Sequence, residues 1–213
     1  MILATNNKNK IREIKQILTS YEIKSLSDVN INIDVEEDQD TFFGNASKKA
    51  KEIFEAIKEP VIADDSGICI DYFDNWPGVM THRFLGDNAS DKERNLAIIN
   101  KLESLEGDDR KASVICSLVY YDGNDFVEGK GILRGYIVTN PRGENGFGFD
   151  EIFELDSIEL DDNCNWGQEQ AATCTEIIKR LKGKTLAELT AEEKNNISAR
   201  YLATIDLKNK LEK

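Results

Sequence analysis

The segment 61–67, VIADDSG, constrains the fold of this chain more than any other stretch. Its apolar start predicts a short buried strand, and that strand leads directly into Asp64, Asp65, Ser66 and Gly67. We expect the strand to end at the two aspartates and to deliver their charge to the carboxyl edge of a sheet, where open α/β sheets bind ligands. Adjacent carboxylates there suit a hard divalent cation and phosphate chemistry. The alternative is a simple turn, because Asp, Ser and Gly all favour turns.

The N-terminus predicts a strand, a polar turn and a helix. Met1–Ala4 is a short apolar strand, and the segment 5–10, TNNKNK, follows as the turn. Apolar residues then recur at helical spacing over 11–18, which indicates a helix with one buried face. A helix N-terminus offers free backbone N–H groups and a positive dipole end, and Lys10 adds a positive charge for an anion. An ordinary Asn-rich turn with solvated lysines is the alternative.

A second strand and helix are expected before the VIADDSG segment. Apolar and polar residues alternate over 31–35, which predicts a strand that ends in the acidic run 36–38. Thr41 is then placed to cap a helix. Lys49 lies between the apolar positions of that helix, so we expect it at the helix edge, directed toward a site. A charged helix face is more often only the solvated one.

The central part of the chain predicts another helix and a hairpin. Ser90 and Glu93 have the spacing of a capping box at a helix start. The segments 112–121 and 126–138 read as strands joined by a turn with the Asp-Gly pair typical of hairpins. The only histidine, His82, cannot form a metal site by itself and is assigned no role.

A glycine-rich segment, PRGENGFGFDEIF at 141–153, is the second concentration of polar residues. Its glycines allow close backbone approach, and Phe147 and Phe149 flank them. An aromatic ring followed by Asp150 suits a planar base, because the ring stacks and the carboxylate accepts N–H protons from the base edge. The alternative is a loop whose two phenylalanines belong to the core.

The C-terminal region predicts one long helix. Thr190 and Glu193 have capping-box spacing, and the helix is expected to run toward Lys213 with Lys194 and Arg200 a little under two turns apart. Before it, the chain is acidic from residue 156 and contains a short helix candidate without identifiable chemistry.

Composition limits the possible partners and the location. A chain of 213 residues with 40% hydrophobic residues has enough apolar side chains for one good core. Its net charge of −13 argues against long nucleic acids and anionic membranes as partners. The N-terminus does not read as a signal peptide, and no apolar run is long enough to span a bilayer. Four cysteines without paired metal-site spacing favour reduced thiols, so we expect a cytoplasmic protein.

Five segments together resemble the inosine/xanthosine triphosphate pyrophosphatase family, enzymes that remove deaminated purine nucleoside triphosphates from the nucleotide pool. They occur in the family's order and extend over nearly the whole chain. The segments are ILATNNKNKIREI at 2–14, EEDQDTFFGNASKKA at 36–50, ADDSG at 63–67 with the later PGV and Arg83, PRGENGFGFDEIF at 141–153, and KNNISAR at 194–200.

The resemblance implies roles for individual residues. The turn at 5–10 matches a phosphate-binding turn, the segment 147–150 a base-binding loop, Lys194 a substrate-binding lysine and Arg200 an arginine that reads the purine. The substrate-binding residues implied are Thr5, Asn6, Asn7, Lys8, Asn9, Lys10, Ser66, Phe147, Gly148, Phe149, Asp150, Lys194, Ala199 and Arg200.

The resemblance also implies a Mg²⁺-dependent mechanism. The catalytic residues are then Asp65, Lys10, Glu37 and Lys49, and the metal ligands are Glu37, Asp65 and Asp64. Asp65 activates a water for in-line attack at the α-phosphorus, which releases pyrophosphate and the nucleoside monophosphate. Donors directed at the 6-oxo oxygen of the purine exclude adenine.

The implied fold is a mixed, twisted α/β sheet with flanking helices and two lobes around a central cleft. The whole chain, 1–213, forms a single nucleoside triphosphate pyrophosphatase domain, with an insertion at about 154–183. The expected partners are a small-molecule nucleoside triphosphate and a second copy of the chain in a homodimer, but no nucleic acid and no membrane.

One departure from the family leaves the base preference open: the last motif usually reads Ser-His-Arg, and this chain has Ala199 in place of the histidine. Two alternative functions stay open. One is a Maf-like pyrophosphatase that acts on other modified nucleotides. The other is a nucleotide-binding protein without turnover, in which Ala199 marks a drift away from catalysis. The retained carboxylates and Lys10 argue against a mere binding protein, which has no need of a group that activates water.

Overall fold

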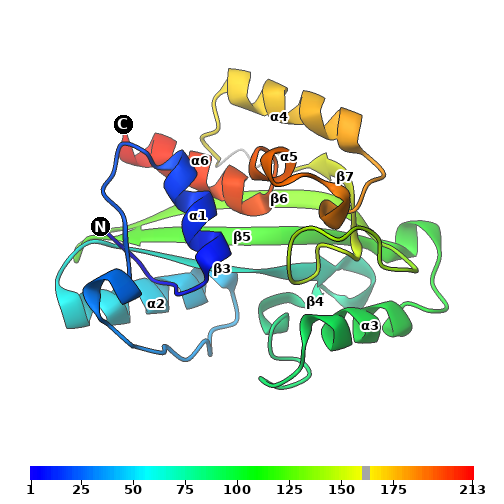
Figure 1. The fold of residues 1–213 in the computed structure, drawn as a ribbon, viewed down its shortest axis with the longest axis horizontal. Helices are drawn as coiled ribbons and strands as arrows, with labels where there is room; N and C mark the ends of the chain where they lie inside the picture. The colour runs from blue at the N-terminus through cyan, green and yellow to red at the C-terminus, as the bar shows by residue number, and fades with distance from the viewer. Residues whose placement is uncertain (160–163) are drawn as a thin grey trace.

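A computed structural model describes residues 1–159 and 164–213 of the chain. Its centre is a mixed sheet of seven strands in the order β2-β1-β3-β5-β6-β7, with β4 paired to β3 (Figure 1). The strands are β1 (Ile2–Leu3), β2 (Lys24–Ser25), β3 (Val61–Ile70), β4 (Trp76–Pro77), β5 (Lys111–Tyr121), β6 (Phe126–Ile137) and β7 (Phe153–Ile158). The helices are α1 (Lys8–Ile17), α2 (Phe42–Ile57), α3 (Asp91–Lys101), α4 (Gln168–Leu181), α5 (Ala191–Asn195) and α6 (Ala199–Leu211).

Helices cover both sides of the sheet. In Figure 1, α1, α4, α5 and α6 lie on one side and α2 and α3 on the other. Strand β3 serves both layers because successive side chains of a strand point to opposite faces. Ile62 and Ile68 join the main apolar cluster, which includes side chains of α1 and α6, whereas Val61 and Ala63 join a second cluster with α2. The predicted mixed α/β fold with flanking helices is confirmed.

The predicted helix starts agree with the structure. Thr41 caps α2 by accepting a hydrogen bond from the Gly44 amide at 2.9 Å, and Ser90 with Glu93 forms the capping box of α3. The hairpin of β5 and β6 is also present. Among the described residues, no helix has the length and apolarity needed to cross a bilayer.

The prediction that the VIADDSG strand ends at the aspartates was wrong. β3 continues to Ile70, because β5 pairs with it along its whole length, from Val61 opposite Tyr121 to Ile70 opposite Ala112. The parallel neighbour β1 pairs only with the first two residues of β3. The two aspartates therefore lie inside β3, just beyond the end of β1.

The predicted strand over 31–35 is also absent. The alternation is real, since Ile31, Ile33 and Val35 pack on the second apolar cluster. However, the strand that pairs with β1 is β2, at Lys24–Ser25. The segment is irregular and makes no strand-pairing hydrogen bonds in the structure. Its side chains alternate in burial because one side of the segment packs on the apolar cluster.

The predicted C-terminal helix is broken into α5 and α6. The Thr190–Glu193 capping box starts α5 as expected, but this helix ends at Asn195. Ser198 then caps α6 by accepting from the Tyr201 amide at 3.1 Å. Lys194 and Arg200 consequently lie on different helices.

The region of the predicted insertion, about 154–183, belongs to the fold rather than to a loose loop. It contains most of β7, which pairs with β6, and α4, whose Cys174, Ile178 and Leu181 join the main core. Its residues 160–163 lie outside the described residues. That it is an insertion relative to the family stays a prediction.

Helix α6 packs directly on two glycines of β6. A Cβ atom at Gly131 would lie 2.1 Å from the carbonyl oxygen of Ala199, and one at Gly129 would lie 2.1 Å from that of Ala203. We therefore expect Gly131→Ala to force α6 away from the sheet and to lower the free energy of unfolding by about 1–3 kcal/mol. Urea unfolding measures this; unchanged stability would show that α6 moves without cost.

Candidate functional site

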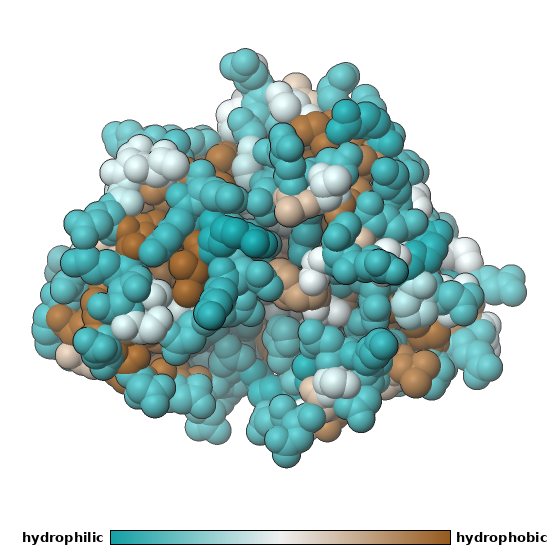
Figure 2. All heavy atoms as spheres, viewed as in Figure 1, coloured by the Kyte–Doolittle hydropathy of each residue, from teal (hydrophilic) through white to brown (hydrophobic). Residues whose placement is uncertain are grey.

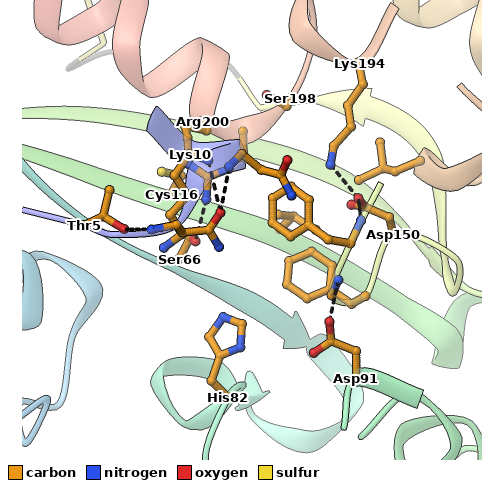
Figure 3. A pocket seen from close by; sticks show the side chains of 18 residues that line it. Thr5, Lys10, Ser66, His82, Asp91, Cys116, Asp150, Lys194, Ser198 and Arg200 are labelled. Atoms are coloured by element: carbon orange, nitrogen blue, oxygen red, sulfur yellow. Dashed lines mark hydrogen bonds and ion pairs between the residues drawn. The ribbon is translucent and has the colours of Figure 1, made fainter. Parts of the chain in front are cut away.

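A cavity of about 360 Å³ opens between the N-terminal end of α1, the 141–152 loop and the start of α6. Figure 2 shows the surface hollowed near the centre of the view, with polar residues around the hollow. The cavity is lined by Thr5, Asn7, Asn9, Lys10, Ser66, His82, Asp91, Val114, Cys116, Phe147, Gly148, Phe149, Asp150, Leu186, Lys194, Ser198, Ala199 and Arg200 (Figure 3).

A larger groove of about 920 Å³ adjoins the cavity. Its lining includes Glu37, Lys49 and Asp64, and it shares Thr5, Lys10 and His82 with the cavity. A ligand with an apolar, planar end and a charged end can therefore extend from the cavity into the groove past these three shared residues.

The shared end of both sites is built by the start of α1. Asn7 caps this helix, because its side-chain oxygen accepts hydrogen bonds from the amides of Asn9 at 3.0 Å and Lys10 at 3.3 Å. The Thr5 hydroxyl accepts from the Asn7 amide at 3.1 Å. The positive end of the α1 dipole thus faces the junction of cavity and groove, which favours an anion there.

The two aspartates of β3 point to opposite faces of the sheet, as alternation along a strand requires. On one face, the Asp64 carboxylate accepts ion pairs from Lys10 at 2.9 Å and from Arg200 at 3.3 Å. Arg200 also bonds to Glu13 at 2.7 Å. Burial opposes ionisation of Asp64, but Lys10 and Arg200 outweigh it and hold the pKa of this carboxyl far below its ordinary value.

On the other face, Asp65 meets α2. One carboxylate oxygen accepts from the Asn45 amide group and the other from the Ser66 backbone N–H, both at 2.9 Å. Burial raises the pKa of Asp65 to about 6; Glu37 and Asp64 add to the rise, whereas Lys49 and the Asn45 hydrogen bond oppose it. Asp65 is therefore a stronger base near neutral pH than an ordinary aspartate.

Lys49 joins Glu37 to the backbone of β3. Its ammonium donates to the Glu37 carboxylate and to the backbone oxygen of Asp64, each at 2.6 Å. Arg83 forms a second ion pair with Glu37. Burial acts against the charged form of Glu37, but Lys49 and Arg83 hold its pKa below the ordinary value. The expected position of Lys49 at the site is observed.

The three predicted metal ligands do not form a ready-made cage. Within 1–159 and 164–213, no group of three His, Cys, Asp or Glu side chains is arranged to hold a metal ion. Asp64 is turned away from Asp65 by strand alternation and is paired with cations. Glu37 bonds to Lys49, and Asp65 lies near enough to act on the charge of the same lysine. Two carboxylates fit Mg²⁺, which usually takes its remaining ligands from water and substrate phosphates.

The far end of the cavity is formed by the glycine-rich loop and α5. The buried Asp150 carboxylate accepts from the Phe147 amide at 2.7 Å and pairs with Lys194 at 2.5 Å. Burial raises the pKa of Asp150, and Lys194 opposes this. The Lys194 ammonium lies 4.3 Å from the Phe147 ring centroid. Gly146 is required in this turn, because it has φ of +84° and a Cβ there would meet Asp150.

Most of the predicted site residues are brought together. Of the predicted substrate contacts, Asn6 lines the groove and Lys8 lines neither space; the others line the cavity. Asp65 is 5% exposed and lines neither space; its carboxylate is bonded to the Asn45 side chain and the Ser66 amide. Sequence reasoning did not assign Asp91, Val114, Cys116, Leu186, Ser198 or His82 to the site, because none of these residues belongs to a local pattern that indicates a binding role.

Asp65 also makes the stability of the metal-free protein depend on pH. Its pKa is raised from 3.8 to about 6 by folding, so the stability from its bound proton is full below about pH 4 and lost as the pH rises through about 6. Relative to Asp65→Asn, the wild type is expected to lose on the order of 1 kcal/mol between about pH 5 and about pH 7.5. Urea unfolding in EDTA measures this; a constant difference between the two proteins would contradict it.

Comparison with known proteins gives a consistent result. Residues 1–210 match the Ham1 family. A dITP/XTP pyrophosphatase of Thermoanaerobacter sp. (strain X514) is 37% identical over 213 residues, with coverage of 98% of this chain and 94% of the relative. The dITP/XTP pyrophosphatase of Bacillus subtilis (strain 168) is 36% identical over 214 residues, with coverage of 99% and 96%.

Solved structures agree with the sequence comparison. A HAM1 protein from Coxiella burnetii superposes with a TM-score of 0.80 at 31% identity, over 99% of this chain and 97% of that chain. The Ham1 protein of Staphylococcus aureus superposes with a TM-score of 0.79 at 31% identity, over the same shares of both chains.

Proposed function

Because the chain belongs to the Ham1 family, we propose that it hydrolyses non-standard purine nucleoside triphosphates such as ITP, dITP and XTP to the monophosphate and pyrophosphate. This nucleoside triphosphate pyrophosphatase activity removes deaminated nucleotides from the pool. One observation carries the proposal. The Lys194 ammonium, which can only donate hydrogen bonds, lies over the Phe147 ring in the cavity, and the cavity adjoins the larger groove.

Selectivity for a 6-oxo purine follows from the hydrogen-bonding groups at the closed end of the cavity. The base stacks on the aromatic loop, and its 6-oxo oxygen accepts a hydrogen bond from the Lys194 ammonium. Adenine presents an amino group at that position, so donor faces donor and the buried groups lose their partners, at about 1–3 kcal/mol each. The predicted purine contact of Arg200 stays a prediction, since its guanidinium already bonds to Glu13 and Asp64.

The triphosphate then lies along the groove. The positive end of the α1 dipole and the Lys10 ammonium face the phosphates at the junction, and Lys49 and Arg83 line the groove beyond. These cations are held in place by carboxylates, so they are pre-organised to stabilise the charge that develops as the α–β phosphate bond breaks.

We assign the cofactor as Mg²⁺, bound by Glu37 and Asp65 together with the substrate phosphates. When bound, the ion neutralises charge on the phosphate oxygens. Asp64 contributes by fixing Lys10 and Arg200 through its ion pairs. This division rests on the ion pairs of Asp64, since Asp64 and not Asp65 lines the groove.

Asp65 is proposed to be the general base. In the metal-free protein its pKa of about 6 leaves it ionised at neutral pH and a stronger base than an ordinary aspartate. The water attacks the α-phosphorus in line with the leaving pyrophosphate. Because Asp65 is buried and lines neither the cavity nor the groove, substrate binding must open a path to the carboxylate.

We also propose that the protein acts as a homodimer in the cytoplasm. The resemblance supports the dimer, and the cysteines support the compartment, because Cys69, Cys116 and Cys174 form no disulfide within the described residues. Light scattering after gel filtration tests the dimer: the measured mass is expected at twice 24.0 kDa, and a monomer mass would reject it.

Substrate choice is tested by pyrophosphate release from a panel of triphosphates with and without Mg²⁺. The panel is ITP, dITP, XTP, GTP, ATP and modified pyrimidine triphosphates. We expect Mg²⁺-dependent release with kcat/KM for ITP, dITP and XTP at least about tenfold above ATP, the factor that one lost hydrogen bond supplies. A preference for a modified pyrimidine would favour the Maf-like function, and no release from any nucleotide would favour a binding protein without turnover.

A further inference from the structure

His82 lies where the base cavity meets the phosphate groove. It is the only histidine of the chain. Of the residues that line the cavity, only His82, Thr5 and Lys10 also line the groove. It belongs to the segment between β4 and α3 and faces the α1 end across the cleft (Figure 3). None of the family-derived assignments gives this residue a function.

The imidazole of His82 is uncommitted. In the described part of the chain, neither ring nitrogen makes a hydrogen bond; the only bond at this residue is from Arg94 to its backbone oxygen, at 3.2 Å. By contrast, Lys10, Lys49 and Arg83 are each paired with a carboxylate. His82 therefore offers a nitrogen donor to a ligand without breaking an existing bond.

The charges around His82 suit an anion. Lys10 of α1 and Arg94 of α3 act on it from two sides, against Asp91 of α3 and Glu37 of the groove wall. The His82 side chain is exposed at the mouth of the cleft, where partial desolvation, followed by the two cations, lowers its pKa. The direction of this shift favours the neutral ring in the free protein. A bound polyanion offsets the effect of Lys10 and Arg94 and favours the imidazolium.

We propose that His82 binds the phosphate chain of the substrate at the point where it passes from the cavity into the groove. This rests on the proposed function for the identity of the substrate. Phe147, Asp150 and Lys194 form the base end of the cavity and already contact one another there. The junction instead contains the start of α1 and Lys10. A donor at the junction therefore contacts phosphate rather than base.

The test uses two probes that separate phosphate from nucleoside. Calorimetry with magnesium tripolyphosphate at about pH 6.5 is expected to show about tenfold weaker binding to His82→Ala than to the wild type, the size of one charge-assisted hydrogen bond. Inosine binding is expected to be unchanged. Asn88→Ala, an exposed position in the same segment, serves as the control and should match the wild type.

His82→Gln tests whether the charge of the imidazolium contributes, with a side chain that can still donate a hydrogen bond. Glutamine keeps a donor but cannot be protonated, so tripolyphosphate affinity should fall more steeply with rising pH for the wild type than for this variant. The dependence that both proteins share comes from the titration of tripolyphosphate and of Asp65. Equal tripolyphosphate affinity for the wild type and His82→Ala would overturn the proposal, as would weaker inosine binding. Because tripolyphosphate binding needs no turnover, these results are independent of whether ITP is hydrolysed.

Discussion

Asp65→Asn is expected to lower kcat for pyrophosphate release from ITP by about 10³-fold, because the amide cannot accept a proton from the attacking water. Binding should be largely retained: asparagine has nearly the same shape, and its oxygen can keep one of the two hydrogen bonds, from Asn45 or from the Ser66 amide. Equilibrium binding of ITP to the variant, together with its steady-state kinetics, separates the two effects.

The control for this change is Asp125→Asn, the same substitution at an exposed carboxylate in the β5–β6 turn. It should leave kcat, KM and stability unchanged. An Asp65→Asn enzyme with near-normal turnover would remove Asp65 as the base. A loss of ITP binding equal to the loss of rate would instead make Asp65 a binding residue.

Arg200→Met is expected to lower the free energy of unfolding by about 3–5 kcal/mol, the usual cost of removing one partner of a buried ion pair. Arg200 is 8% exposed and bonds to Glu13 and Asp64, which are themselves almost fully buried. Asp64 keeps Lys10 in the variant, but Glu13 loses its ion-pair partner. Urea unfolding at neutral pH measures the loss.

Two further variants make this result specific. Arg180→Met removes an arginine that is 69% exposed and weakly paired with Glu193, so it should cost less than about 0.5 kcal/mol. Adding Glu13→Gln to Arg200→Met removes the unpaired buried charge and should recover part of the lost stability. If both arginine variants cost the same, Arg200 does not hold buried charge in the way its contacts indicate.

The parts of the fold that local chemistry specifies were predictable from the sequence. Thr41 at the start of α2 and Ser90 with Glu93 at the start of α3 are side-chain caps that act within one turn, so the residues at those positions are sufficient evidence. The same holds for the Asp-Gly turn of the β5–β6 hairpin. Ser198 is also a cap, but the continuous helical spacing around it concealed the break before α6.

The candidate site was predictable as a set of segments but not as a geometry. The motifs made it possible to predict Lys10, Lys49, Asp150 and Lys194 as site residues, because each motif contains the residue types that its chemistry needs. His82 was missed because a single histidine has no local signature; only the packing of its segment across the cleft from α1 brings it to the junction.

By itself, the sequence determined the family, most of the helices and strands, the caps of α2, α3 and α5, and most of the residues that line the cavity. Tertiary structure alone decided where β3 ends and therefore what its aspartates do. Strand length depends on the partner: β5 pairs with β3 through Ile70. Once the aspartates lie inside a strand, alternation sends Asp64 to Lys10 and Arg200 and Asp65 to Asn45. One neighbour thus anchors cations, and the other is left with the raised pKa of a base.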